Sequence, residues 1–578
     1  MASLAARPIQ IFLLVLAIPL GLFAQRNLVI EGGTLIDGTG RAPLRDAVIV
    51  IEGNKIAAVG EKGRVTPPPG AQVISAAGKF VLPGLIDTHV HWDSWMPELF
   101  LAHGVTTAVD FSSTDWQVRQ RQILLDGRMR GPRLFVTAAI GGGRLLWDSP
   151  PSPAAESAQI ARRLTREAGP GREKYNLTKA YTELTADQLQ AIVEESHKAG
   201  RYVVAHLGSL DARQAVEIGV DALAHASGVA AATITDPAKA EELRNFARMG
   251  ISVDYPLYVM YHAFMDPAKV DELIPLLVQK NVRIEPDLVN TSGRGVPTHR
   301  EVWKAEDRRL LQDPNLDYVP VDNRGRVFYY DSWDQLDSQQ QDQFLRGYTN
   351  LQTFLRKFVQ AGGKLLAGCD TASFVLPGVC LHREMQLYVD AGLTPMQAIQ
   401  AATKNNAEFL QESGLGTIEP GKLADLILLR ENPLADIRNT KTVDVVIKDG
   451  EVIDTRYHDD FVNPEPRPPR DFTFPHPKPL LRAVYPMSAK ELNKDVKLTI
   501  EGTNLADESV VLFDGVEVPT APVKSSLVPH TAYDPRYMQL NATVPGRLLN
   551  RIGTYRVVVK NPRPHGGTSN VQSFFVVP

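Results

Sequence analysis

Two histidines, His89 and His91, stand two residues apart after the apolar run Phe80–Ile86, in the segment Pro83-Gly-Leu-Ile-Asp-Thr-His-Val-His91. Side chains at positions i and i+2 of a β-strand point to the same face, so this spacing would place two imidazoles side by side. Neutral imidazole is a common ligand for zinc and similar divalent metals. The pair therefore predicts half of a metal site, although two ordinary histidines in a turn would show the same spacing.

Three further polar side chains, Lys179, His206 and His225, each lie late in one of three successive predicted strands. In a parallel α/β barrel the late-strand residues meet at one face, which is where such barrels carry their active sites. Taken singly, each residue could be a satisfied core histidine or a lysine that extends its charge to the surface. Their equivalent positions in three strands instead predict one shared site.

The elements that position these residues alternate between strands and helices from residue 104 to residue 405. This alternation is typical of parallel α/β architecture. One helix is well marked, because Thr185 and Gln188 form a capping box at its start and Gly200 ends it. A second helix over 210–218 is expected to end at Gly219.

Asp370 ends the apolar strand Lys364–Asp370, immediately before a loop. A solvated aspartate at a strand end is the alternative interpretation. A further helix is predicted after it, with Thr394 as the N-cap, Pro395 at the first helical position and Gln397 completing a capping box.

Two segments, 229–265 and 291–350, fit the alternation poorly. The first contains an additional strand-like run, Ile251–Tyr258, and the second is charged with scattered aromatic residues. Long insertions after barrel strands often build a binding pocket or a lid. An excursion on the surface is the alternative.

The N-terminal residues 1–25 resemble a secretory signal peptide, with Arg7 before the apolar stretch Ile11–Leu22 and a small residue, Ala24, near a cleavage point. We therefore expect an exported protein, periplasmic or extracellular, and an uncleaved anchor is the alternative. No later stretch is long and apolar enough to span a bilayer. Residues 27–80 then form short strand-like pieces separated by turns, which predicts a small β unit.

The chain has 578 residues, which is too long for one core and predicts two or three domains. The formal charge of −4 offers no basic surplus for phosphates, so nucleic acid is not an expected partner. Cys369 and Cys380 are the two cysteines. Their spacing alone does not indicate a disulfide, and we expect each to be a small buried hydrophobic residue.

A proline-rich linker is predicted over 457–482, and the pattern after it changes to strands alone. Asp514-Gly515 between two apolar runs is a hairpin signal. Residues 483–578 have the size of an immunoglobulin-like β-sandwich, and Tyr485-Pro486, Ile500–Leu505 and Leu512–Gly515 resemble the IPT/TIG type. Packing or tethering is its simplest role, and contact with a glycan or a protein is the alternative.

Over roughly residues 27–456 the chain resembles the metal-dependent amidohydrolases, and the imidazolonepropionase-like and prolidase-like branch is the most similar. The matching motifs are Gly84–His91, Gly104–Thr107, Leu381–Glu384, Ala391–Pro395 and Gly416–Leu426. The resemblance implies a (β/α)₈ barrel with a small β-sandwich built from both of its flanks. The expected organisation is a signal peptide (1–25), a composite β-sandwich (26–80 and 415–456), a barrel (81–414), a linker (457–482) and an Ig-like domain (483–578).

The resemblance also implies two divalent metal ions, for which we expect zinc, and an N-carboxylated lysine that bridges them. Position by position, the implied ligands are His89, His91, Lys179, His206, His225 and Asp370. Such a pair of ions can hold a bridging hydroxide at neutral pH. In the family the residue matching Asp370 also moves protons, so Asp370 is the expected catalytic residue.

Relatives of this branch often carry a histidine after the glycine pair that follows the third strand, whereas here Gly141-Gly-Gly is followed by Arg144. A guanidinium favours a carboxylate or another anion in the substrate. Tyr258 is a weaker candidate for substrate binding, and ordinary packing is an equally good interpretation of it.

These features together predict an exported hydrolase that cleaves the C–N bond of a small molecule. The expected substrates are a cyclic amide, an N-acyl amino acid or an Xaa-Pro-type dipeptide. Hydrolysis of a lactone or another ester is the first alternative. A non-catalytic binding protein on the same scaffold is the second, which the complete set of six ligand residues disfavours.

Overall fold

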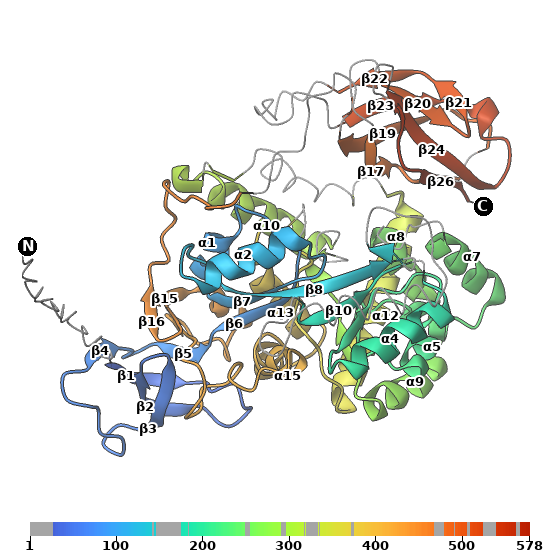
Figure 1. The fold of residues 1–578 in the computed structure, drawn as a ribbon. Coiled ribbons are helices and arrows are strands. Elements are labelled where there is room, and N and C mark those ends of the chain that lie inside the picture. Colours follow the sequence, from blue (N-terminus) through green and yellow to red (C-terminus); the bar gives the residue numbers. More distant parts are fainter. Residues whose placement is uncertain are drawn as a thin grey trace, which may run out of the picture.

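The structure is a computed structural model, and the arrangement of its elements is shown in Figure 1. It describes residues 27–141, 144–145, 175–182, 184–248, 255–290, 296–316, 318–319, 333, 336–371, 375–466, 479–490, 492–503, 505, 509–523, 539–561 and 567–577. The predicted signal peptide and most of the linker's second half lie outside the described residues. Within them, no helix has the length and apolar character needed to cross a membrane.

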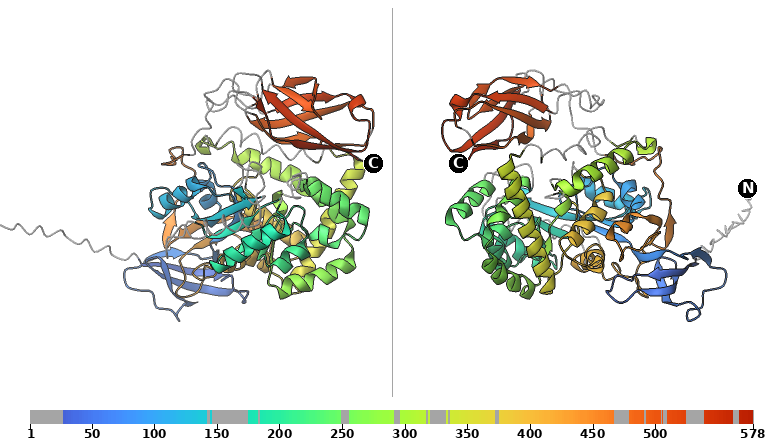
Figure 2. Two further views of the ribbon diagram at one scale, coloured as in Figure 1. Left: turned by 45° about the vertical axis from the view of Figure 1, so that its right-hand side comes forward. Right: turned by 180° about the vertical axis from the view of Figure 1, so that it is seen from behind.

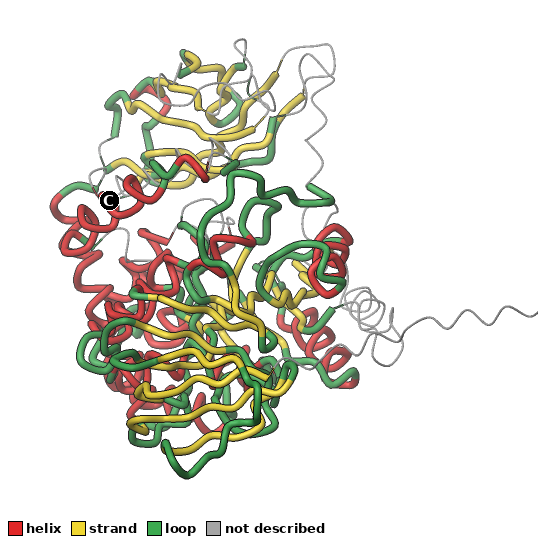
Figure 3. The backbone as a smooth tube through the Cα atoms, turned by 90° about the vertical axis from the view of Figure 1, so that its left-hand side faces the viewer, coloured by secondary structure: helices red, strands yellow, loops and turns green. Residues whose placement is uncertain are grey.

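An eight-stranded sheet combines strands from both flanks of the predicted catalytic region, in the order β16-β15-β14-β5-β1-β2-β3 with β4 on β1. The two flanks meet where β14 pairs antiparallel with β5, and Leu426 lies opposite Pro83. Figure 3 faces this end of the molecule and shows these strands lying side by side. The strands are β1 (Asn27–Leu35), β2 (Leu44–Glu52), β3 (Lys55–Glu61), β4 (Gln72–Ser75), β5 (Phe80–Pro83), β14 (Leu426–Leu429), β15 (Val443–Lys448) and β16 (Glu451–Ile453).

A curled parallel sheet forms the centre of the molecule, in the order β13-β12-β11-β10-β8-β7-β6 with β9 antiparallel on β8. The segment 364–371 lies between its two edge strands, because parallel bridges join Leu365 to Ile284 and Thr371 to Val90. The strands are β6 (Leu85–Val90), β7 (Val105–Asp110), β8 (Arg133–Gly141), β9 (Arg144–Leu145), β10 (Leu177–Ala180), β11 (Val203–Ala205), β12 (Ala222–Ala224) and β13 (Arg283–Glu285). Successive parallel strands therefore point their carboxyl ends, and the predicted site residues, to one face.

Helices cover the outside of the curled sheet, as both views in Figure 2 show. They are α1 (Pro97–Ala102), α2 (Asp115–Leu125), α4 (Ala186–Lys198), α5 (Ala212–Ile218), α6 (Val229–Thr233), α7 (Pro237–Arg248), α8 (Tyr255–Tyr261), α9 (Pro267–Gln279), α10 (Pro297–Leu310), α12 (Ser338–Gln360), α13 (Val379–Asp390), α14 (Pro395–Ala401) and α15 (Lys404–Phe409). Their apolar stripes join the sheet in one core that includes Leu189, Leu273 and Phe354. Short 3₁₀ helices span His262–Phe264, Pro314–Leu316, Ile437–Lys441 and Gly546–Leu548.

Several predicted helix ends are confirmed by their capping contacts. The side chain of Thr185 accepts a bond from the backbone N–H of Gln188 at the start of α4, and Thr394 does the same for Gln397 at the start of α14. Gly219 ends α5 in the left-handed conformation, with φ of 111°. These local signals place the helices, and hence the strand ends between them.

The strand-like run Ile251–Tyr258 was predicted as a strand, and this prediction is wrong for its described part. Residues 255–258 instead begin helix α8. Pro256 lies in the first turn of α8, where its fixed φ suits a helix and its missing N–H costs nothing. An apolar run of this length cannot be assigned to strand or helix by its periodicity alone.

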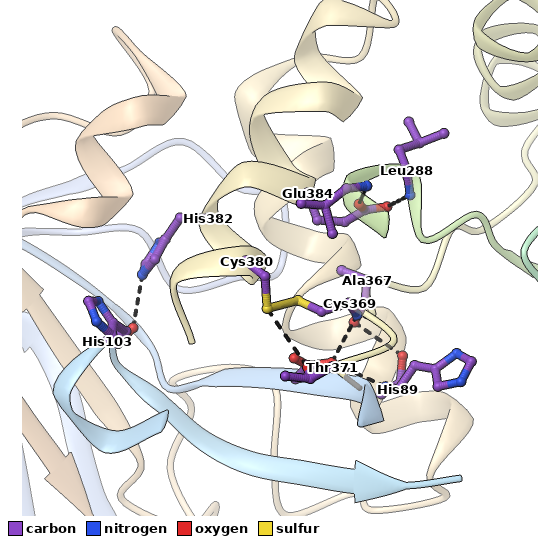
Figure 4. Close-up of a disulfide and its surroundings, with 12 residues drawn as sticks. His89, His103, Leu288, Ala367, Cys369, Thr371, Cys380, His382 and Glu384 are labelled. Atoms are coloured by element: carbon purple, nitrogen blue, oxygen red, sulfur yellow. Dashed lines mark hydrogen bonds between the residues drawn. A yellow bond between two sulfur atoms is a disulfide. The ribbon is translucent and has the colours of Figure 1, made fainter. Parts of the chain in front are cut away.

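Cys369 and Cys380 form a disulfide, which corrects the prediction that each is an unpaired hydrophobic residue. Cys369 lies in segment 364–371 and Cys380 in the first turn of α13, so their Cα atoms come within 5.9 Å although they are 11 residues apart. Figure 4 shows the bond beside Thr371, whose hydroxyl lies 3.8 Å from Cys380 Sγ. The sequence spacing of the two cysteines could not predict the disulfide, because the bond depends on how the chain turns between the central segment and α13.

We expect the purified oxidised protein to contain no thiol that reacts with Ellman's reagent after denaturation. Both cysteines are fully buried and paired, so two thiols should appear only when the denatured protein is first reduced and the reductant is then removed. Two reactive thiols without reductant would show that the cysteines are unpaired, as the sequence alone suggested.

Two sheets make up the C-terminal unit, in the orders β17-β19-β23-β22 and β18-β26-β24-β20-β21 with β25 on β24. Side chains of both sheets share one core, for example Leu498 and Leu540 with Val557 and Phe574. The Lys490 ammonium lies 2.9 Å from Gln339 Oε1 of α12, which joins the unit to the central part. The strands are β17 (Leu480–Tyr485), β18 (Ser488–Ala489), β19 (Val496–Thr503), β20 (Val510–Phe513), β21 (Val516–Val518), β22 (Thr520–Pro522), β23 (Gln539–Val544), β24 (Gly553–Asn561), β25 (Gly567–Thr568) and β26 (Gln572–Val576).

A buried ion pair anchors α13, and we expect its loss to be costly. Arg383 is fully buried and donates two bonds to Asp307, at 2.7 and 3.0 Å. Arg383→Met would leave the Asp307 carboxylate buried without this cation, so we expect the free energy of unfolding to fall by about 3–5 kcal/mol. Urea unfolding measures this. The exposed Arg438, which pairs with Asp436, is the control, and Arg438→Met should leave the unfolding midpoint unchanged.

Candidate metal centre

All six predicted metal ligands come together at the carboxyl ends of the parallel strands. His89 lies in β6 and Lys179 lies in β10. Directly after β6, β11 and β12 come His91, His206 and His225, and the central segment 364–371 carries Asp370 near its end. Five of the six are buried, and the His91 side chain is partly exposed, at 34 %. The late-strand rule therefore predicted positions that the fold brings to one place.

Asp370 contacts both histidines of the first strand. Its Oδ1 lies 2.9 Å from His91 Nε2 and 3.5 Å from His89 Nε2. The two imidazole rings are 5.5 Å apart between centroids, so they lie side by side as the i, i+2 spacing predicted. Three nitrogen or oxygen donors of this kind within 4.8 Å of one another can ligate one divalent ion.

The histidines of the later strands continue this cluster. The His225 ring lies 5.0 Å from the His89 ring and 4.4 Å from the His206 ring, measured between centroids. Tyr181 packs edge-on against His206 at 5.1 Å. A second group of donors, His89, His225 and Asp287, also lies within 4.8 Å and is fully buried.

Lys179 places a buried amine beside these groups. The residue is 1 % exposed, and its Nζ has no hydrogen-bond partner among the described residues. The amine lies 4.4 Å from the centroid of the Phe111 ring, which also packs against His89. Burial lowers the pKa of Lys179, although the nearby carboxylates of Glu285, Asp287 and Asp370 oppose the shift. A lowered pKa favours the neutral amine, which is the form that reacts with carbon dioxide to give a carboxylated lysine.

Asp370 is held as an anion in a strained backbone conformation. Its φ of 48° lies in the left-handed region, which non-glycine residues adopt mainly at turns and functional sites. The amide of Asn290 donates to its second oxygen, Oδ2, at 2.6 Å. Burial alone would raise the pKa of Asp370, but the adjacent His89 and His91 outweigh burial and hold the pKa well below its usual range.

A second set of polar residues, which the sequence did not predict, ends or follows β13: Glu285, Asp287 and Asn290. Burial raises the pKa of Glu285 to about 8. Burial, with the nearby carboxylates of Glu285 and Asp370, also holds the pKa of Asp287 well above its usual range. The same late-strand rule that indicated His206 would have indicated Glu285. The sequence lacks a clear strand signal here, because β13 has only three residues and two of them are charged.

Two further buried carboxylates fix the backbone around the cluster. Glu384 of α13 accepts bonds from the backbone N–H groups of Leu288 and Val289, at 2.8 and 2.6 Å, and so holds the turn after β13. Asp87 accepts bonds from the N–H groups of His89 and Cys369, at 3.1 and 3.2 Å. It thereby ties together the two segments that carry His89 and Asp370.

The two predicted substrate-binding residues differ in what the structure shows. Arg144 lies in β9, where its backbone pairs with Gly141, and its side chain lies outside the described atoms. Tyr258 is buried in α8, and its hydroxyl accepts a bond from the Gly228 N–H at 2.7 Å. This contact supports the loop after His225, which agrees with the packing interpretation of Tyr258.

The donors fit divalent metal ions. Imidazole nitrogens and carboxylate oxygens are the ligands that zinc and similar ions use. The buried Lys179, whose amine has no hydrogen-bond partner in the part of the chain that the structure describes, lies close to them. A third group of potential donors, Asp87, Cys369 and Cys380, offers no thiolate, because its two sulfurs form the disulfide. The cluster of histidines, Lys179 and Asp370 is therefore the candidate metal centre.

Comparison with known proteins agrees with this geometry. The model of the amidohydrolase family matches residues 352–453, which include Asp370 and the last strands of the eight-stranded sheet. A crystal structure of a Xaa-Pro dipeptidase with methionine bound in its active site superposes with a TM-score of 0.52 at 21% identity, over 74% of this chain and 100% of that one. At this identity the likeness concerns the fold.

Two curated relatives share short segments with the chain. It is 38% identical over 91 residues to the N-acyl-D-aspartate deacylase of Alcaligenes xylosoxydans xylosoxydans, covering 15% of this chain and 18% of that protein. It is 46% identical over 67 residues to the N-acyl-D-glutamate deacylase of the same organism, covering 12% and 13%. The chain thus matches less than a fifth of the length of either relative.

Proposed function

We propose that this chain, whose residues 352–453 match the amidohydrolase family, is a metal-dependent hydrolase that cleaves C–N bonds of small molecules. The observation that supports this best is the convergence of three kinds of groups in one buried place. Imidazoles in or directly after β6, β11 and β12 lie together with the anionic Asp370 and with the amine of Lys179, which has no hydrogen-bond partner within the described part of the chain. Burying an amine that makes no hydrogen bond costs free energy unless another group binds it. A metal-bridging carboxylate formed on Lys179 would remove this cost.

We propose that the centre holds two divalent ions, with zinc as the expected metal. The residues that would hold them are His89, His91, Lys179 as its N-carboxylate, His206, His225 and Asp370. Bound ions would supply Lewis acidity, which lowers the pKa of water and polarises a carbonyl. This is the chemistry that hydrolysis of an amide at neutral pH requires.

We propose that Asp370 transfers the proton during hydrolysis. Asp370 is an anion whose Oδ1 faces the centre, while Asn290 holds its Oδ2, so it is placed to accept the proton of the attacking water. The same carboxyl can deliver that proton to the departing nitrogen. His91 is steadied by a contact of 2.7 Å between its Nδ1 and Ser112 Oγ, which keeps its Nε2 toward Asp370.

The architecture that we propose for this activity is a complete (β/α)₈ barrel. The bridges on both sides of segment 364–371 support it as the eighth strand. The eight-stranded sheet from both flanks supports the composite β-sandwich of 26–80 and 415–456. We propose that residues 483–578 form an IPT/TIG-like Ig domain with a packing or tethering role, supported by their two sheets around one core.

For the substrate we favour an N-acyl amino acid, ahead of an Xaa-Pro-type dipeptide. The segments shared with two deacylases of N-acylated acidic amino acids support this choice, and so does Arg144, since a guanidinium suits a carboxylate. We further propose that the protein is exported, on the basis of residues 1–25. A substrate with a free carboxylate next to the scissile amide is thus the first class to test.

The test is a screen of the purified protein against N-acyl amino acids and dipeptides, with lactones and esters alongside. Release of free amine should depend on metal, being lost after chelation and restored by zinc. An Arg144→Gln variant should raise KM for the carboxylate substrates more than for their methyl esters. Hydrolysis of the lactones alone, or no turnover by fully metallated protein, would contradict C–N hydrolysis.

A further inference from the structure

Two carboxylates at the end of β13 face the outer nitrogens of the histidine rings. Asp287 Oδ2 lies 2.9 Å from His225 Nδ1 and 3.2 Å from His89 Nδ1. Glu285 Oε2 lies 3.1 Å from the same His89 nitrogen. Both carboxylates are fully buried, so each contact is made away from water. One oxygen of Asp287 thus serves two rings that come from different strands.

The other nitrogen of His89 faces the centre. His89 Nε2 lies 3.5 Å from Asp370 Oδ1 and belongs with His91 and Asp370, whereas its Nδ1 faces β13. A neutral imidazole has one lone pair and one N–H, so it can offer only one nitrogen to a metal. If Nε2 binds the ion, Nδ1 carries the proton and needs an acceptor, which the carboxylates of Asp287 and Glu285 provide.

Gly368 of the central segment allows the β13 carboxylates to approach His89 closely. A Cβ added to Gly368 would overlap Glu285 Oε1, and it would come within 2.7 Å of His89 Cβ and 3.0 Å of Asp287 Oδ1. Glycine at this position therefore leaves room for the β13 carboxylates to reach His89. The Thr88 hydroxyl donates to the remaining Glu285 oxygen at 2.6 Å and orients that side chain.

We propose that Asp287 is a shared positioning residue of the metal centre. One of its oxygens accepts the Nδ1–H bond of His89 and lies in ion-pair contact with His225 Nδ1, and so orients both rings with Nε2 free for metal. Glu285 is the second acceptor for His89. The inference rests on the proposed metal-dependent function and extends it to residues outside the expected ligand set. Partners of this kind typically contribute 10- to 100-fold to metal affinity, as an order of magnitude.

The experiment removes metal from the full-length protein with a chelator and titrates cobalt(II) back, following the visible spectrum. Asp287→Asn keeps the shape of the side chain, and asparagine tolerates the φ of 47° at this position. Asp221→Asn is the matched control, because Asp221 also contacts a histidine, His197, at 2.8 Å but lies at the opposite end of β12. Asp287→Gly, which also suits a positive φ, removes the acceptor entirely and serves if the first variant does not fold.

We expect Asp287→Asn to weaken cobalt affinity by about 10- to 100-fold and Asp287→Gly by at least as much, with the spectrum at saturation unchanged. Asp221→Asn should bind like the wild type. An altered spectrum at saturation would show that Asp287 is itself a ligand, and unaltered affinity would show that it positions nothing; either result overturns the proposal. Failure of the wild type to bind cobalt would instead contradict the proposed function, so the two failures are distinguishable.

Discussion

Replacing Asp370 by asparagine is expected to lower kcat by a factor of about 10²–10⁴ while leaving the fold intact. Asparagine has the same shape and tolerates the φ of 48°, but it cannot take up a proton. The anion that His91 and Asn290 contact would disappear with it. Steady-state turnover and the thermal midpoint of the same preparation measure the two effects separately.

The control for this variant is Asp514→Asn. Asp514 also adopts a positive φ, of 47°, but it lies in the hairpin between β20 and β21. The control should retain both wild-type turnover and the wild-type thermal midpoint. If Asp370→Asn kept more than half of the wild-type kcat, the proton-transfer role would be refuted.

Replacing Lys179 by alanine is expected to remove most of the bound metal and the activity with it. The lysine is buried and its amine has no hydrogen-bond partner among the described residues, so its carboxylated form is the group that would join the two ion positions. Without that anion the remaining imidazoles hold the ions less well. Short-chain carboxylic acids or added carbon dioxide should partly restore activity, because a small anion can occupy the space left by the side chain.

Lys364→Ala is the control for the lysine variant. Lys364 begins the central segment 364–371 that carries Asp370, and it pairs with Glu408 at the opposite end of that segment from Asp370. Metal content should be unchanged in this control. Full metal content in Lys179→Ala, with no response to added acids, would contradict the bridging role.

The predictable part of the site came from local rules that act within one element. Thr185 and Thr394 carry capping boxes that locate helix starts, so the strand ends between helices were located as well. His89 and His91 obey the two-residue period of a strand. Once strand ends are known, the parallel fold brings them to one face, and this is why separated residues such as His206 and Asp370 could be assigned to one centre.

The unpredicted part depends on contacts between distant elements. The bond between Cys369 and Cys380 requires that α13 begin beside the central segment, which spacing does not encode. Asp287 reaches His89 across 198 positions of sequence, and no periodicity connects them. Residues 255–258 form the start of a helix rather than a strand. The periodicity of a short apolar run does not distinguish the two structures, so the surrounding fold decides between them.

The most direct test of the central claim is the metal content of the protein, measured by elemental analysis on the wild type and on His206→Ala prepared together. His206 is 2 % exposed and packs against His225 in the centre, so its loss should weaken one of the two proposed ion positions. We predict about two equivalents of divalent metal per chain in the wild type and clearly fewer in the variant. No bound metal in the wild type, even after incubation with zinc, would contradict the account and favour a non-catalytic binding protein on the same scaffold.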